Sequence, residues 1–322
     1  MKSFFLYELL AHCSTMTDKT YTLAQTIARF YQQGKKPVPY VSTNTTEAMM
    51  SLYLPTQHGL RDPEHKDMIN DYKKYGRTHS LRQKITPDLS GSALYLEFDK
   101  KGKLISSNQD EYFPEFYWRL RELIEANPGR KVACTFNSAI SEGEPIMEGH
   151  CVIVVYDPAL NTLEFMDSNN LPKQRARVHH AYFIYCEISN DIMRKVAAAL
   201  PSVPIYINNH SIYSGYDYGV QSMEASSDKH TDSEREGFCL MWAILLGDLA
   251  LSFPDESMAA IIDSLKKKSK SKQNSSESEN DYLLQVIRGY VVHITNTLEV
   301  AFDDETSKHQ ACVRLALNAQ EI

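Results

Sequence analysis

The chain has 322 residues, a length that suits one large domain or two modest ones and exceeds that of a disulfide-stapled mini-domain. Apolar residues make up 43% and charged residues 23%, so a packed core is expected and wholesale disorder is excluded. The formal net charge of −7 argues against a general nucleic-acid binder and against adhesion to an anionic membrane surface.

The chain shows no sign of a membrane span, because no apolar run approaches the roughly 20 residues that a spanning helix needs. Its first ten residues contain Glu8 and no clear cleavage site follows, so they are expected to form a first helix or strand. The cysteines are scattered without a Cys-x-x-Cys pair, which favours a reduced compartment over a disulfide framework or a zinc knuckle. They are Cys13, Cys134, Cys151, Cys186, Cys239 and Cys312.

The first third of the chain is expected to be irregular and mostly helical. Asp18 to Gln33 has apolar residues on one helical face, with Thr17 or Asp18 as a cap and Gly34 as a stop. Pro37 to Gln83 is polar and rich in proline, and its pattern assigns no element.

The middle of the chain alternates strand and helix patterns. Cys151 to Tyr156 is a continuous β-branched run, typical of a strand buried on both faces, and Thr162 to Met166 is its expected hairpin partner. The other expected strands are Ala93–Phe98, a return strand from Leu104, Lys131–Phe136, Ala181–Ile188 and Pro204–Ile207, and the expected helices are Pro114–Ala126 and Asp191–Leu200.

The last third contains a helix that must be buried. Phe238 to Leu251 is apolar nearly all round and follows a polar, acidic loop over Glu224 to Glu236. A flexible loop is expected near residues 266–280 and a last helix from Asp281 to Asn296. Strands followed by a buried helix indicate an α+β architecture.

A histidine and a carboxylate are expected at the same end of the predicted hairpin. A turn near residues 157–161 lays His150 opposite Asp167. A carboxylate beside an imidazole fixes the tautomer and stabilises the charged ring, as a general base requires. Cys239 opens the buried helix, where free N–H groups and the helix dipole favour a thiolate.

Each of these residues alone has an ordinary structural explanation. A cysteine entering an apolar helix is most often a small buried hydrophobe, and Asp167 alone is a turn residue. The combination of the three is more specific than its parts. Other chemistry has less support: His179 and His180 lack a third metal ligand, and neither a phosphate loop nor a Gly-x-Ser-x-Gly motif is present.

Three segments together resemble a known family. They are Gly149-His150 before Val-Ile-Val-Val-Tyr-Asp, Leu-Glu-Phe-Met-Asp167-Ser168, and Gly237-Phe238-Cys239-Leu-Met-Trp242. They resemble the ubiquitin-like-protein protease superfamily of cysteine peptidases, which includes SUMO- and NEDD8-specific proteases, the adenovirus proteinase and bacterial effectors. The resemblance covers about Val132 to Leu251.

The resemblance also implies an oxyanion-hole glutamine before the cysteine, and Gln221 is the match. Gln221 precedes Cys239 by 18 residues, a longer spacing than in SUMO proteases, which places this chain closer to the viral and bacterial variants. Cys151 stands where the family has a tryptophan after the histidine.

The resemblance implies a papain-like core, in which a central mixed sheet packs on the buried helix that carries the catalytic Cys239. This core is expected over residues 131–322, and residues 1–130 are expected to form an accessory region for substrate recognition. The implied activity is a thiol isopeptidase that removes ubiquitin, SUMO or NEDD8 after a terminal Gly-Gly, with His150, Asp167, Cys239 and Gln221 in the site. No cofactor or metal is expected.

Two rival functions stay open. One is an effector acetyltransferase that uses the same triad with acetyl-coenzyme A, for which Lys266 to Lys272 would supply a basic patch. The other is a non-catalytic binder of a ubiquitin-like protein. We expect a cytoplasmic monomer that binds no nucleic acid. The inserted loops favour, as a further hypothesis, a microbial or viral protein that is secreted into a host cytosol.

Overall fold

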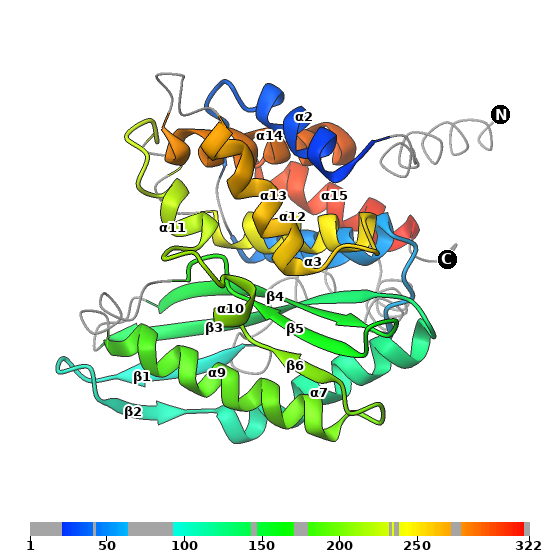
Figure 1. Ribbon diagram of the computed structural model, residues 1–322, viewed down its shortest axis with the longest axis vertical. Coiled ribbons are helices and arrows are strands. Elements are labelled where there is room, and N and C mark those ends of the chain that lie inside the picture. Colours follow the sequence, from blue (N-terminus) through cyan, green and yellow to red (C-terminus); the bar gives the residue numbers. More distant parts are fainter. Residues whose placement is uncertain are drawn as a thin grey trace.

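The computed structural model describes residues 21–40, 43–63, 93–142, 147–170, 180–231, 234, 238–271 and 278–318. These residues form an α+β fold around a mixed six-stranded sheet in the order β2-β1-β3-β4-β5-β6, with helices on both faces (Figure 1). The α+β prediction is thus confirmed. The strands are β1 (Leu94–Phe98), β2 (Leu104–Ser107), β3 (Val132–Glu142), β4 (Met147–Asp157), β5 (Thr162–Met166) and β6 (Ile205–Ile207).

The long antiparallel pair β3 and β4 forms the centre of the sheet, and β5 pairs antiparallel with β4. The outer pairs β1–β3 and β5–β6 are parallel, which makes the sheet mixed. Alternate residues of β4 enter two different cores. Cys151 and Ile153 belong to one hydrophobic cluster, and Val152 and Val154 belong to the other.

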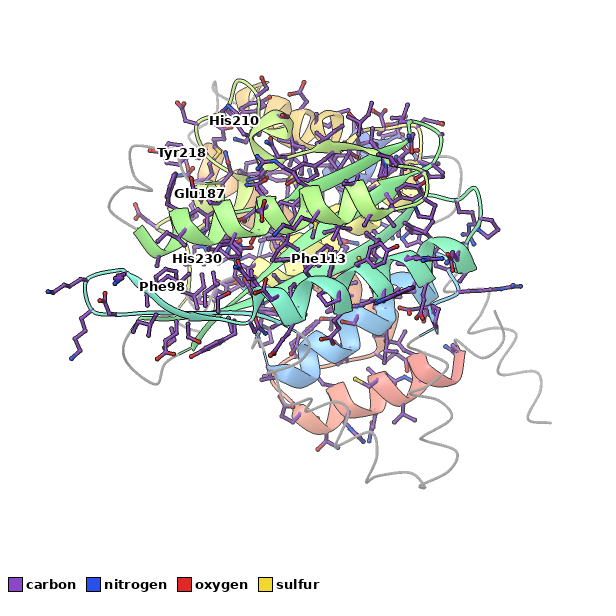
Figure 2. The ribbon with its side chains drawn as sticks, turned by 90° about the horizontal axis from the view of Figure 1, so that it is seen from below. Phe98, Phe113, Glu187, His210, Tyr218 and His230 are labelled. Atoms are coloured by element: carbon purple, nitrogen blue, oxygen red, sulfur yellow. The ribbon has the colours of Figure 1, made fainter. Side chains whose placement is uncertain are left out.

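One face of the sheet is covered by α7 (Gln109–Ala126) and α9 (His180–Ala199). The two helices lie side by side across this face, with Phe113 labelled on α7 and Glu187 on α9 (Figure 2).

The opposite face is covered by a thick helical layer (Figure 1). Its innermost member is α12 (Cys239–Ser252), and all residues from Leu240 to Ala250 are buried. The predicted buried helix is therefore confirmed. The rest of the layer comprises α2 (Leu23–Gln33), α3 (Asn44–Gln57), α13 (Met258–Ser271), α14 (Glu279–Leu298) and α15 (Glu305–Asn318), with short α10 (Asn209–Ile212) and α11 (Val220–Glu224) between β6 and α12.

A buried polar contact connects α12 to α3 and α14. Asp248 of α12 accepts from the hydroxyl of Tyr290 on α14 at 3.0 Å, and its other oxygen lies 2.6 Å from Nε2 of His58, the residue that ends α3. Because Asp248 is 2% exposed, this contact holds three helices together inside the core.

Residues on both sides of position 130 share the sheet and the core. The strand β1 pairs with β3, and Phe30 of α2 packs edge-to-face on Tyr290 of α14, with ring centroids 5.3 Å apart. The suggested role of residues 1–130 in substrate recognition stays a prediction.

Two element predictions were wrong. The segment Ala181–Ile188 is not a strand but the start of α9, because its buried residues recur at helical spacing (Ala181, Tyr185, Ser189 and Ile192). The flexible loop expected near residues 266–280 is absent from residues 266–271, because α13 continues to Ser271 and buries Lys266. Residues 272–277 lie outside the described part of the chain.

Other segments differ in extent or were not predicted. The α2 helix begins after Thr22, whose side chain forms a capping box with Gln25, and it ends at Gly34 as expected. The α3 and α15 helices had no assignment in the sequence. The first ten residues lie outside the described ranges. Within those ranges, no helix is long and apolar enough to cross a membrane.

Candidate active site

Cys239 is the first residue of α12 and follows the buried N-cap residue Phe238. The N–H groups of the first helical turn have no partner within the helix, and they point toward the N-terminal end, where the thiol lies. Cys239 is partly exposed and not in a disulfide, whereas Cys134, Cys151 and Cys312 are buried. Its position is therefore the predicted one, and Gly237 before it lies outside the described residues.

His150 lies on β4, and its Nε2 atom is 2.9 Å from Oδ1 of Asp167. The predicted contact is present, but the predicted register was wrong. The ladder pairs Ile153 with Met166 and Asp157 with Thr162, so Asp167 lies two positions out of line with His150. A shift of two residues keeps both side chains on the same face of the sheet, which is why the contact survives.

The register error came from the turn between β4 and β5. Asp157 stays in the ladder, and its Oδ1 atom accepts from the N–H groups of Ala159 and Leu160. Its other oxygen pairs with Lys131 at 2.9 Å. Asn161 closes the turn with a φ of 50°, in the left-handed region. The turn therefore starts one residue later than the sequence suggested.

The Asp167 carboxylate is almost fully buried and well supplied with donors. Oδ1 also accepts from the N–H of Asn169 at 2.8 Å, and Oδ2 accepts from the hydroxyl of Tyr182 at 2.8 Å. Burial alone would raise the pKa of Asp167, but His150 and these hydrogen bonds lower it below its ordinary value. Asp167 is thus an ionised carboxylate aimed at the imidazole.

The imidazole of His150 joins the carboxylate to the thiol. Because Nε2 bonds to Asp167, the remaining nitrogen Nδ1 is the one available for the hydrogen bond with Cys239. Burial alone would lower the pKa of His150, but Asp167 and Cys239 raise it to about 10. The ring of Tyr185 packs edge-on against the imidazole, with centroids 5.7 Å apart. A charged imidazolium is therefore favoured here.

Gln221 on α11 is hydrogen-bonded to Ser168, the residue after Asp167. The hydroxyl of Ser168 donates to Oε1 of Gln221 at 2.8 Å, and the backbone N–H of Gln221 donates to the carbonyl of Ser168 at 2.9 Å. The bond from the Ser168 hydroxyl to Oε1 fixes the orientation of the Gln221 amide and directs its N–H₂ group away from Ser168.

The segment from Asp167 to Asn170 forms further hydrogen bonds with α11 and with Gly219, the residue before it. The N–H of Gly219 donates to the carbonyl of Asn170 at 2.9 Å, and the hydroxyl of Ser222 donates to Oδ1 of Asn169 at 2.6 Å. From the other side, Asn209 accepts from the N–H of Asp167 at 2.9 Å. One short segment thus positions both the carboxylate and the glutamine.

A buried carboxylate also ties α11 to the first turn of α12. Oε2 of Glu224 accepts from the indole N–H of Trp242 at 3.1 Å, and Oε1 lies 2.5 Å from Nε2 of His230. Trp242 is completely buried, as expected for a core residue. The contact with Glu224 raises the pKa of His230.

The sequence missed several supporting residues. The role of Tyr182 was not predicted because the composition of its segment resembles a strand. Asn209 and Glu224 belong to no sequence motif. The Asp167-Ser168 dipeptide is visible in the sequence, but no pattern in the sequence links Ser168 to Gln221. Among the described residues, no group of three His, Cys, Asp or Glu side chains is placed to hold a metal ion.

In comparisons with protein-family models, curated proteins and solved structures, no match to this chain was found. The contacts of His150 with Asp167 and Cys239 are therefore the observation that bears on function.

Proposed function

We propose that this protein is a thiol isopeptidase of the ubiquitin-like-protein protease type, with a papain-like arrangement in which α12 presents Cys239 to the sheet. One observation carries the proposal. Side chains from β4, from the end of β5 and from the start of α12 meet in the order Asp167–His150–Cys239. The bond from Asp167 to Nε2 leaves Nδ1 for the thiol, which is the polarity that a nucleophile, its base and an orienting carboxylate require.

The reaction begins from the ion pair in which the Cys239 proton has already passed to Nδ1 of His150, so that a thiolate faces the imidazolium. The thiolate attacks the carbonyl carbon after the terminal Gly-Gly of a modifier and forms a tetrahedral oxyanion. The N–H of Cys239 and the amide N–H₂ of Gln221 donate to this oxyanion. The C–N bond then breaks, and the imidazolium gives its proton to the leaving lysine amine.

The second half of the reaction consumes water. His150, neutral after it protonates the amine, removes a proton from a water molecule that attacks the thioester. A second oxyanion forms and collapses with cleavage of the C–S bond, so the modifier leaves with a terminal carboxyl group and Cys239 is again a thiolate beside the imidazolium. Throughout, Asp167 stabilises the imidazolium and holds the ring in one orientation.

The substrates of this proposal are ubiquitin, SUMO or NEDD8 and their conjugates, and the setting is the cytosol of a host cell invaded by a microbe or virus. If the protein were found only in the cytoplasm of a producing bacterium after cell fractionation, the setting would be wrong while the chemistry could stand.

The acetyltransferase alternative has less support. It needed a basic patch at Lys266–Lys272 for a phosphorylated activator. Lys266 is buried, its ammonium lies 4.2 Å from the centroid of the Tyr216 ring, and it donates to the carbonyl of Tyr218. Lys266 therefore belongs to the core and leaves the patch without its first member.

The test is adduct formation with ubiquitin, SUMO and NEDD8 that carry an electrophile at the terminal glycine. We expect a mass shift with one of them, absent in Cys239→Ala and retained in Cys186→Ala, a matched change at another partly exposed cysteine. No adduct with any probe would overturn the isopeptidase proposal. Binding to a modifier without an adduct would favour the non-catalytic binder.

A further inference from the structure

The helix α12 packs along β4, so each position along the helix can be matched to the strand residue that lies beside it. Near its middle, Gly247 lies against Ile153, because a Cβ atom added at Gly247 would come within 2.9 Å of Cδ1 of Ile153. At its start, Cys239 contacts His150. About 12 Å of helix separates Gly247 from Cys239, and about 10 Å of strand separates Ile153 from His150. The next residue of β4 beyond the start of α12 is Gly149.

Gly149 borders an open space on the face of the sheet that α12 covers. Side chains alternate along a strand, so Gly149 shares this face with Cys151 and Ile153. Gly149 is exposed, and a Cβ atom added there would meet no heavy atom of the described residues within 4 Å. The space lies at the end of the helix where the thiol is partly exposed.

Nothing in the described structure requires a glycine at this position. A glycine inside a strand is normally explained by a left-handed φ, by a bulge or by a close backbone approach. The φ of Gly149 is not left-handed, and the β3–β4 register runs without a shift from Val132 and Tyr156 to Ser141 and Met147. By contrast, Gly219 lies against the carbonyl of Ser168, where a side chain cannot fit.

The remaining reason for a strand glycine is the close approach of a ligand. We propose that Gly149 forms part of the wall of a channel that leads the substrate to Cys239, and that its missing side chain makes room for an extended polypeptide segment. This inference rests on the proposed function, which it extends from the nucleophile to the path of the substrate.

An extended polypeptide fits this place better than a compact ligand. The β4–β5 ladder ends at Ile153 and Met166, so within the described residues Gly149 has a strand neighbour only on the β3 side. An extended chain can lie along the other edge of β4 and lead its carbonyl to the thiol.

The test adds bulk at Gly149 without touching the nucleophile. Gly149→Ala and Gly149→Val are compared with the wild type and with Ser106→Val, which adds the same kind of bulk at an exposed position of β2. Each variant is first shown to be folded by thermal unfolding. The rate of Cys239 alkylation by iodoacetamide and the rate of adduct formation with the glycine-terminated protein probes are then measured.

We expect alkylation rates within about twofold of the wild type in every folded variant, because iodoacetamide needs little room. The rate with the reactive protein probe is expected to fall about 10²-fold in Gly149→Val, less in Gly149→Ala and not in Ser106→Val. A folded Gly149→Val that reacts with the protein probe like the wild type would overturn the inference and leave the proposed function intact. A wild type that reacts with none of the probes would overturn both.

Discussion

His150 and Asp167 are in contact at 2.9 Å although they do not face each other in the β4–β5 ladder. Asp167 follows the last paired residue of β5, so the ladder does not hold its side chain in place. The hydroxyl of Tyr182 and the N–H of Asn169 do so instead. The geometry of the proposed dyad therefore depends on a loop and on α9 as much as on the sheet.

Replacing Asp167 by asparagine is expected to lower turnover strongly. The asparagine would keep the shape of the side chain but not the charge that raises the pKa of His150, so kcat/KM is expected to fall by about 10²–10⁴-fold. The alkaline limb of the pH–rate profile is also expected to move to lower pH. The control is Asp191→Asn, an exposed carboxylate on α9. An unchanged rate in Asp167→Asn would mean that another group orients the imidazole.

The raised pKa of His150 predicts how stability changes with pH. Since this pKa rises from 6.5 to about 10 on folding, protonated His150 stabilises the folded state. The contribution is complete below about pH 6.5, declines as the pH rises and is lost above about pH 10. The difference in unfolding free energy between wild type and His150→Gln, measured by urea denaturation, is expected to shrink over this range.

His293 provides a control of opposite sign. Burial lowers the pKa of His293, so its neutral form is the one that the folded state favours. In the wild type, the unfolding free energy is expected to decrease as the pH falls below about 6.5, because the unfolded state then binds the proton more readily. His293→Gln is expected to remove this part of the pH dependence. The same direction of change in both variants would contradict the assignment of charge to His150.

The sequence predicted those parts of the fold in which local pattern and tertiary packing agree. The apolar run of α12 and the β-branched run of β4 require burial wherever they lie, and both were placed correctly. In α9, by contrast, the run Tyr182–Tyr185 has strand-like composition, and only the packing of Ala181 and Tyr185 on the sheet decides for a helix.

The candidate site was partly predictable for a similar reason. His150, Asp167 and Cys239 lie at the ends of elements that the sequence indicates, and their order along the chain carried the family resemblance. The contact of Glu224 with Trp242 and His230 depends on how α11 packs on α12, which no local pattern records.

Ser168 is expected to act through Gln221. Ser168→Ala removes the hydroxyl that fixes Oε1, so the amide loses its single orientation and kcat is expected to fall several-fold with little change in KM. Gln221→Ala is expected to fall further, by about 10²-fold. The double variant is expected to match Gln221→Ala alone, because Ser168 has no amide left to orient. Additive losses would show that Ser168 acts by another route.

Substitutions at Glu224 and Glu234 can be compared to distinguish an effect on the position of Gln221 from an effect on the stability of the fold. Both carboxylates are buried, but Glu224 bonds to Trp242 of α12, whereas Glu234 pairs with Arg288 of α14 and accepts from the N–H of Val38. Glu234→Gln leaves the guanidinium of Arg288 buried without its counter-charge, which is expected to cost about 3–5 kcal/mol of unfolding free energy.

The two variants are expected to differ in activity when only folded protein is counted. Glu224→Gln weakens the contact that holds α11, and with it Gln221, against the start of α12, so kcat is expected to fall about tenfold at unchanged KM. Glu234→Gln is expected to keep the kcat of the wild type. The measurement is single-turnover kinetics well below each unfolding midpoint. Equal loss of kcat in both variants would mean that Glu224 acts through stability alone.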